Sequence, residues 1–362
     1  MVTTASTVKR EYEFEPDYAI APGVTLLELV ESFSMSQKEF AIRTGITEQS
    51  LNRIFKGEQP ISYETSNRLE LVTGVPANYW NNLESQYRDQ LAKIQERERL
   101  LENIEWLKTI PVRELMNRSY IDDVRDKVTT LRNVLAFFGV SSVAAWGDIW
   151  AVPAVAARRS ECFETRPGHA SAWIRQGELK AQDVECSPYD KKKFKAALKQ
   201  IRLLTREEPG VFQPELQRLC AEAGVAVVFV PEMKKVPWGG ATKWLNPNKA
   251  MILLSLRGKA EDKLWFSFFH EAGHVLHDSK KDLLINDGKH DDPREVRANE
   301  FAADTLIPPQ RNEDVRALRS KTDVLTLAAD LEISPGIVAG RYQHLTQKWQ
   351  TFNGLIRKLQ WA

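Results

Sequence analysis

The chain has 362 residues, with 50 basic and 49 acidic side chains and a formal net charge of +1 at pH 7. This length accommodates two or three domains with ordinary cores. The balanced charge excludes a protein held on nucleic acid by an overall basic field, so any DNA binding must rest on a local surface.

Cysteine usage and hydropathy indicate the compartment. Cys162, Cys186 and Cys220 are odd in number and far apart, which argues against a disulfide framework and for a reducing interior. No apolar stretch approaches the ~20 residues that span a bilayer, and the N-terminus lacks a signal-peptide segment. We therefore expect a cytoplasmic protein without a membrane segment.

The first predicted element is a pair of short helices joined by a tight turn. Ser36, with Glu39 three residues later, has the pattern of a capping box that opens a helix. Ala41, Gly45 and Leu51 follow helix-turn-helix spacing, in which the small residue lets the helices cross closely and glycine permits a left-handed turn. This spacing predicts a helix-turn-helix domain.

Polar side chains around the second helix suit contacts with base edges and phosphates in the major groove of DNA. The candidates for DNA contact are Gln37, Thr47, Gln49, Ser50, Asn52, Arg53 and Lys56. Residues 36–57 carry four basic and two acidic side chains, a net +2, so tight non-specific DNA binding is not expected. Since some helix-turn-helix domains bind only protein, a protein-interaction module is the alternative.

Short strings in this region resemble the HigA-type antitoxin repressors, a lambda-repressor-like group of the XRE class. The matching strings are Gln37-x-x-Phe40-Ala41, Gly45-Ile46-Thr47, Asn52-x-Ile54-x-x-Gly57, Pro60-Ile61 and Ala77-Asn78-Tyr79-Trp80-x-Asn82-Leu83. The resemblance covers about the first quarter of the chain. It implies a homodimer on a palindromic operator and, as in some members, a toxin partner.

The next predicted elements are helical. A charged helix from Asn82 to about Lys108 carries one apolar stripe, which fits either a dimer seam or packing on the following helices. Val124–Phe138 predicts another helix, which ends at Gly139. The tryptophans and alanines that follow are more typical of a core than of a ligand site. We expect this middle region to be a helical scaffold.

Three strands are predicted next. Gly224–Val230 and Ala250–Leu256 are apolar and rich in β-branched or aliphatic residues, as in buried strands. Between them, Gly239–Leu245 predicts a more polar strand, followed by a turn at Asn246–Asn248. The polar strand suits either a sheet edge, where a peptide substrate adds by β-pairing, or an ordinary hairpin.

A His-Glu-x-x-His run, His270-Glu271-Ala272-Gly273-His274, comes next. On a helix, the two histidines lie one turn apart on the same face, so both imidazoles can reach one metal ion. Glu271 lies beside them, where it can take a proton from a metal-bound water. The flanking residues are apolar nearly all round, and a buried helix rarely carries such polar groups unless something coordinates them. We predict a zinc (Zn2+) site.

A catalytic zinc usually has three protein ligands, so a third must follow downstream. The candidates are His277, His290, Glu295 and Glu300, with Asp278, Asp291 and Asp292 nearby. In a helix predicted from Asp292 to Asp304, Glu295 lies four residues before Asn299, whose amide could orient a ligand. Glu300 points away from that pair. Glu295 is our predicted ligand, with Glu300 in reserve.

These residues resemble the ImmA/IrrE family of bacterial metallopeptidases. The matching strings are His270-Glu271-Ala272-Gly273-His274, Glu295-x-x-Ala298-Asn299-x-Phe301-Ala302-Ala303 and Leu306-Ile307-Pro308. The resemblance covers roughly the second half of the chain; Thr305 departs from it, since members more often have Leu there. It implies a compact zincin-like fold, Glu295 as a zinc ligand, and cleavage of a DNA-binding repressor on a stress or signal.

The mechanism expected is metal-assisted hydrolysis with Glu271 as general base. Tyr342 and His344 follow in a short helical stretch and are candidates for stabilising the oxyanion, although packing or capping of that helix is the alternative. The run Thr326–Pro335 weakly resembles a second helix-turn-helix, which we interpret as a lid or packing element.

The sequence thus predicts a multidomain, mainly α protein. Its predicted parts are an all-α helix-turn-helix domain (1–85), a helical linker or scaffold (86–200), an α+β zincin-like metallopeptidase core with a small mixed sheet (201–310) and a C-terminal helical subdomain (311–362). We expect a DNA-binding regulator that cleaves a repressor, an antitoxin or itself in a stress, toxin–antitoxin or phage-defence response. The alternative is a non-catalytic DNA-binding repressor or antitoxin whose zinc domain senses a signal or binds a partner; a pure binding site would not need Glu271.

Overall fold

The computed structural model describes residues 17–151, 167–280, 284–285 and 292–361. Contacts divide the chain into two compact units, Met1–Ile104 and Glu105–Ala362. This division differs from the four predicted parts. A continuous helix passes through residue 85, so the first part of the predicted scaffold, to residue 104, belongs to unit 1. The rest of the scaffold, the metallopeptidase core and the C-terminal subdomain fall in unit 2.

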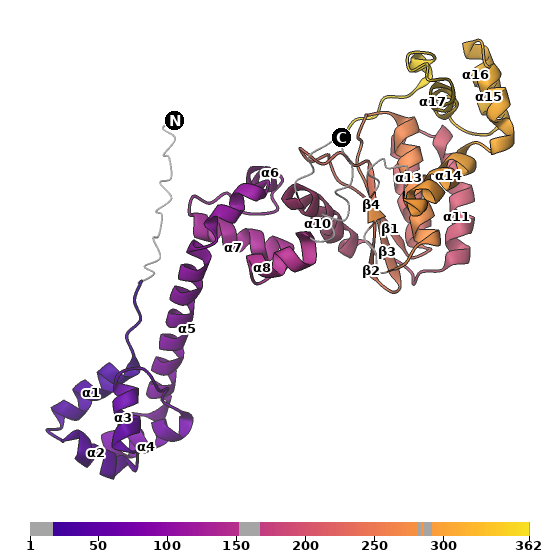
Figure 1. The fold of residues 1–362 in the computed structure, drawn as a ribbon. Coiled ribbons are helices and arrows are strands. Elements are labelled where there is room, and N and C mark those ends of the chain that lie inside the picture. Colours follow the sequence, from indigo (N-terminus) through magenta and orange to yellow (C-terminus); the bar gives the residue numbers. More distant parts are fainter. Residues whose placement is uncertain (1–16, 152–166, 281–283, 286–291, 362) are drawn as a thin grey trace, which may run out of the picture. The chain divides into compact units, whose positions relative to one another are not determined.

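The described residues of unit 1 form helices and no strand (Figure 1). Its helices are α1 (Pro22–Ser32), α2 (Gln37–Thr44), α3 (Glu48–Phe55), α4 (Tyr63–Thr73) and α5 (Ala77–Leu101). The predicted turn is confirmed, because Gly45 ends α2 in the left-handed region at φ 65° and the Thr47 hydroxyl caps α3 by accepting from the Ser50 amide. Leu51 is 1% exposed and packs in the core of the unit.

Only one of the two hydrogen bonds of the predicted capping box of α2 forms. The Ser36 hydroxyl accepts a hydrogen bond from the Glu39 amide at 3.1 Å, as expected. The Glu39 carboxylate, however, pairs with Arg43 one turn later, where the guanidinium donates at 2.8 and 3.0 Å. The (i, i+4) ion pair has replaced the second bond of the box.

Before its sheet, unit 2 contains helices of the predicted scaffold and, from residue 201, of the predicted metallopeptidase core. They are η1 (Ile104–Thr109), α6 (Val112–Asn117), α7 (Lys127–Phe138), α8 (Val143–Trp146), η2 (Gly147–Ala151), α10 (Pro167–Asp183), α11 (Lys191–Leu203), η4 (Leu204–Arg206) and α12 (Pro209–Ala221). The Lys127–Trp150 stretch is long and apolar enough to cross a membrane by length and composition, contrary to our expectation. Its chain turns at Gly139 (φ 68°), and Phe138 and Trp150 are buried in a core cluster. Core helices of soluble proteins pass the same test, so the stretch gives no argument for a membrane segment.

A small mixed sheet follows, as predicted. Its strands are β1 (Val225–Phe229), β2 (Gly240–Asn246), β3 (Lys249–Leu254) and β4 (Leu284–Ile285), in the order β1-β3-β2-β4. β1 pairs with β3 in parallel, whereas β2 pairs antiparallel with both β3 and β4. Of the two interpretations left open for β2, the hairpin is observed, since β2 pairs antiparallel with β3 next along the chain. The sheet-edge interpretation is wrong at Ala241 and Thr242, which pair with β4.

Helices cover both faces of this sheet. The remaining elements are α13 (Glu261–His277), α14 (Pro293–Leu306), η5 (Pro309–Arg311), α15 (Asn312–Ala317), α16 (Lys321–Asp330), α17 (Pro335–Thr346) and η6 (Asn353–Leu355). Val225 and Val227 pack in one core cluster with α11–α14, α16 and α17, while Ala226 and Val228 pack in the other with α7 and α10. The alternation is that of a strand buried on both faces.

Candidate metal centre

Helices α13 and α14 bring the predicted ligands together. His270, Glu271 and His274 are fully buried on α13, and Glu295 on α14 is 6% exposed. The two helices approach closely at Gly273, where an added Cβ would lie 3.3 Å from the Cα of Ala298. Small residues at this crossing let the first turn of α14 reach the two histidines.

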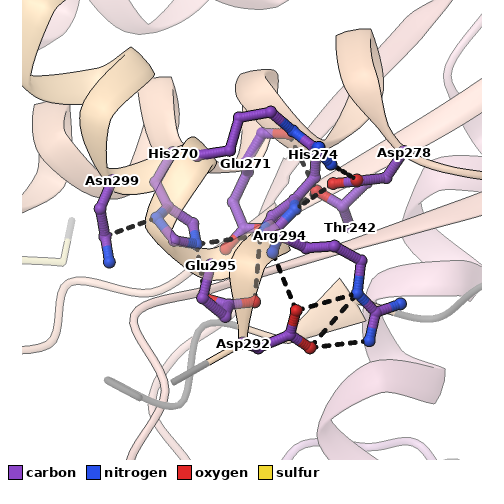
Figure 2. Close-up of polar contacts among 10 residues, drawn as sticks. Thr242, His270, Glu271, His274, Asp278, Asp292, Arg294, Glu295 and Asn299 are labelled. Carbon is purple, nitrogen blue, oxygen red and sulfur yellow. Dashed lines mark hydrogen bonds and ion pairs between the residues drawn. The ribbon is translucent and has the colours of Figure 1, made fainter. Parts of the chain in front are cut away.

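Three ligand atoms converge on one point (Figure 2). The Nε2 atoms of His270 and His274 lie 3.0 Å apart. The Glu295 carboxylate lies 3.1 Å from Nε2 of His270 and 3.3 Å from Nε2 of His274. Two imidazoles and one carboxylate are the donor set of many catalytic zinc sites.

The opposite ring nitrogens are held by oxygen acceptors. Nδ1 of His270 donates to the Asn299 side-chain oxygen at 2.9 Å, and Nδ1 of His274 donates to the Asp278 carboxylate at 2.7 Å. Arg297 pairs with the other oxygen of Asp278. A proton on each Nδ1 leaves each Nε2 with a lone pair for a metal, so these partners fix the tautomer that coordination needs.

Glu271 is positioned by the sheet. The Thr242 hydroxyl on β2 donates to its Oε2 at 2.7 Å. The other oxygen, Oε1, is buried and has no hydrogen-bond partner among the described residues. Gly240 faces the same carboxylate, since an added Cβ there would lie 2.7 Å from Oε1. One oxygen is thus anchored, and the other is available to a water molecule.

The pKa shifts indicate that this cluster attracts positive charge. Burial lowers the pKa of His274, but its contacts with Glu295, Glu271 and Asp278 raise it overall to about 9. Burial raises the pKa of Glu295, but hydrogen bonds and charge from His270 and His274 lower it to about 2. Burial is also the main cause of a raised pKa at Glu271. The site therefore fits a divalent cation in its donor set and its electrostatics.

The other candidates for the third ligand lie elsewhere. Glu300 is exposed, as predicted, and His277 is exposed with its ring against Phe301. Asp292 caps α14 by accepting from the Arg294 amide at 2.8 Å. The candidates His290 and Asp291, and the cysteine Cys162, lie outside the described residues.

The two oxyanion candidates are on α17. Tyr342 is 4% exposed and packs edge-on against Phe352 in the core, whereas His344 is exposed near the end of the helix. The position of Tyr342 supports the packing interpretation. An oxyanion role for either residue stays a prediction, and these positions do not support it.

Sequence reasoning missed two partners of the site. Asp278 was noted only as a residue near the ligands, although its spacing of four residues after His274 was a signal for a helical side-chain pair. Thr242 gave no local signal, because its contact with Glu271 depends on how β2 packs against α13. Both act by holding a residue of the His-Glu-x-x-His run.

In unit 1 the predicted DNA contacts lie mostly on the surface. The exposed members are Gln37, Thr47, Gln49, Asn52, Arg53 and Lys56, and Ser50 is half-buried. The Thr47 hydroxyl is occupied in capping α3, so its contact with DNA would have to share that oxygen.

Two family models match the chain, one within each unit. Residues 220–343 match the IrrE N-terminal-like domain, a peptidase family, and residues 26–80 match a helix-turn-helix family. The chain combines these two domains. No curated protein and no solved structure matches it significantly. An IrrE-like, protease-like domain is thus fused to an N-terminal helix-turn-helix of the XRE type.

Proposed function

We propose that this protein is a cytoplasmic, DNA-binding transcriptional regulator with a zinc-dependent endopeptidase domain, and that it cleaves a repressor, an antitoxin or itself in a stress, toxin–antitoxin or phage-defence response. The observation that carries the proposal is the placement of Glu271. It lies beside three converging ligands, with one oxygen held by Thr242 and the other without a partner among the described residues. A binding site alone has no use for this carboxylate.

The side chains divide the expected chemistry among them. His270, His274 and Glu295 would hold a zinc ion, which would polarise the scissile carbonyl and acidify a water molecule. Glu271 would accept a proton from that water and return it to the leaving amine. Its raised pKa suits both steps, because a carboxylate with a raised pKa is a stronger base and is more easily reprotonated. Asn299 and Asp278 would keep the imidazoles oriented throughout.

Unit 1 would direct the peptidase to an operator. α3 presents Gln49, Asn52 and Arg53 on its exposed face, which suits contacts in the major groove. A homodimer on a palindromic operator, with a toxin as a further partner, completes the proposal. The support for these partners is the match to the helix-turn-helix family and the resemblance to antitoxin repressors.

A Glu271→Gln variant tests the proposal. Wild type and variant would each be assayed for metal content and for cleavage of the repressors and antitoxins encoded beside the protein, and of the chain itself. We expect about one zinc per chain in both proteins and cleavage only by wild type. The His270→Ala control should lose zinc and cleavage together. Cleavage that survives Glu271→Gln would contradict the mechanism.

One observation favours a second candidate function. The side chains of His270, Glu271 and His274 are fully buried, so a peptide could reach them only after the site opens. A zinc domain that senses a signal or binds a partner, without proteolysis, would need no such opening. This candidate predicts that zinc changes operator affinity in Glu271→Gln as much as in wild type, with no cleavage by either.

A further inference from the structure

The exposed face of α11 concentrates positive charge. Residues 191–203 contain five lysines, one arginine and no acidic residue, a net charge of +6. Arg202 is half-buried and donates to the carbonyl oxygens of Thr305 and Leu306, so the exposed face carries the five lysines. With +1 on the whole chain, all other residues together carry −5. The helix is therefore a local exception within a slightly acidic protein and not part of a basic background.

The apolar residues of α11 hold it in the core, so that its lysines face solvent. Phe194, Leu198 and Ile201 are buried against the helices and strand of the larger core cluster. All five lysines are exposed, and none forms an ion pair with a carboxylate of the described residues. They are Lys191, Lys192, Lys193, Lys195 and Lys199.

The placement of these lysines does not serve the stability of the helix. Three of them occupy the first turn, where the helix dipole favours negative charge. Asp190 offsets this only in part, by accepting from the amides of Lys192 and Lys193 at 2.8 and 3.0 Å. Like charges gathered against the dipole repel one another, and an external anion would relieve that repulsion.

The charge of α11 reaches the neighbouring end of α13. Burial is the main cause of a lowered pKa at His277; the charges of Lys191, Arg297 and Lys195 lower it further, and Asp278 opposes them. Arg297 pairs with Asp278, and the exposed side of α14 also carries Glu300 and Asp304. The lysines of α11 are therefore the main source of positive potential there.

We propose that the lysine face of α11 binds the phosphate backbone of DNA, as a sequence-independent contact in addition to α3. The exposed side of α11 offers five lysines, one alanine, one glutamine and, at its end, Leu203, with no aromatic residue or arginine among them. Protein interfaces are depleted in lysine and depend on aromatic and arginine anchors. The helix-turn-helix segment has a net charge of only +2, so it supplies few phosphate contacts of its own. The inference rests on the DNA-binding half of the proposed function and not on the peptidase half.

The test measures the salt dependence of DNA binding by the full, zinc-loaded chain. Fluorescence anisotropy with a 30-base-pair duplex of random sequence would be followed between about 50 and 200 mM salt. The test variant is Lys191→Gln/Lys195→Gln/Lys199→Gln, which removes one stripe of α11. We expect the slope of log K against log salt to become shallower by about 2 to 3, because each lost phosphate contact removes about 0.9.

Two matched variants control for charge and folding. The first, Lys127→Gln/Lys234→Gln/Lys321→Gln, removes the same charge from exposed positions elsewhere in unit 2 and should leave the slope nearly unchanged. The second replaces the three α11 lysines by arginine and should keep the wild-type slope. An α11 variant that behaves like the first control would overturn the inference.

Further outcomes separate this inference from the proposed function. If Asn52→Ala/Arg53→Ala abolishes preference for a DNA site selected from a random library while the α11 variant changes nothing, only the inference fails. If wild type binds no DNA, the DNA-binding half of the proposed function fails with it. If the α11 variant keeps its DNA binding but loses binding to poly-glutamate, the lysine face serves an acidic protein, and the inference is overturned.

Discussion

Among the described residues, α2–α3 in unit 1 and α16–α17 in unit 2 are helix-turn-helix segments with the same spacing. Each has a small residue, a left-handed residue four positions later and a buried apolar residue ten positions later. These are Ala41, Gly45 and Leu51 in the first segment, and Ala328, Glu332 and Val338 in the second. The second helix also begins at the same interval in both, with its cap at Thr47 or Ser334.

The segments differ in what the second helix faces. Counted from the caps, Gln49 of α3 corresponds to Gly336 of α17. Gln49 is exposed, whereas a Cβ added at Gly336 would lie only 2.1 Å from Oε1 of Glu261 in the first turn of α13. The spacing fixes the turn and the helix crossing, but the outward residues decide whether the second helix can meet DNA or is packed into a core.

Metal removal should give the largest difference between the two segments. α17 packs on α13, which carries two of the ligands, whereas α3 belongs to the other unit. An ion bound only by the folded state stabilises it by about 4 kcal/mol at a thousandfold excess over Kd. Chelation should therefore speed hydrogen exchange in α13 and α17 and leave α3 unchanged, as measured by mass spectrometry on the full chain. His270→Ala should exchange fast with or without chelator, and an equal response in α3 would contradict the prediction.

Alanine should lower the stability of the fold at Gly336 and weaken DNA binding at the corresponding Gln49. Gly336→Ala forces a methyl group against Glu261, which cannot easily move because Ser334 and the Arg357 amide bind its Oε1 at 2.9 and 3.0 Å. Overpacking of this kind costs about 1–3 kcal/mol, measured by urea unfolding of unit 2. Gln49→Ala should leave stability within about 0.5 kcal/mol of wild type and weaken binding to a selected operator by about 1–3 kcal/mol.

The reverse result would break the comparison. Loss of operator binding in Gly336→Ala, with normal folding, would mean that α17 also contacts DNA. Loss of stability in Gln49→Ala, with normal DNA binding, would mean that α3 is a packing helix. Either outcome would show that the exposure of the second helix does not decide whether the segment contacts DNA or packs in the core.

Two carboxylates near the ligands in sequence extend the comparison to side chains, because only one of them contacts the metal centre. Asp278 binds Nδ1 of His274, whereas Glu300 on α14 is exposed. Loss of such an oriented partner typically weakens metal binding 10- to 100-fold. Asp278→Ala should do so in a competition with a chelating dye, and Glu300→Ala should match wild type. Zinc lost from Glu300→Ala instead would move the third ligand to that residue.

Much of the site could be predicted because its spacing is local. The ligands His270 and His274 are one helical turn apart, and Glu295 and Asn299 are one turn apart on the next helix, so periodicity alone places each pair on one face. The need for a third zinc ligand pointed to Glu295 with Glu300 in reserve, and the family resemblance implied Glu295. The structure adds the close crossing at Gly273 that makes this ligand set physically reasonable.

The parts that could not be predicted depend on long-range packing. The Thr242–Glu271 hydrogen bond joins residues 29 positions apart, and β4 covers part of β2 through a pairing across 40 residues or more. The packing of α17 on α13 could not be predicted from local sequence. The need for glycine at position 336 arises only because the fold brings Glu261 against it. The half-formed capping box had the right signal, but a competing partner, Arg43, took its carboxylate.

The smallest expected effect concerns the position that corresponds to Arg53 of α3, which is Gly340 of α17. A Cβ at Gly340 would lie 2.4 Å from Oδ2 of Asp262, a mostly buried carboxyl whose other oxygen has no hydrogen-bond partner among the described residues. Burial raises the pKa of Asp262 above its ordinary value, with smaller opposing contributions from Lys263. The folded state therefore binds this proton more tightly than the unfolded state, and Asp262 lowers stability as the pH rises through its pKa.

Asp262→Asn should remove this dependence. The variant should gain stability relative to wild type at pH 7, and the gain should shrink as the pH falls toward the ordinary aspartate value of about 3.9. Urea unfolding of the metal-free proteins at several pH values would measure the difference without contributions from zinc binding. A difference that grows as the pH falls would mean that the carboxylate is stabilised where it lies. The contact of Asp262 with α17 would then stabilise the fold. Burying this face of α17 would have no electrostatic cost, and this difference from the exposed face of α3 would disappear.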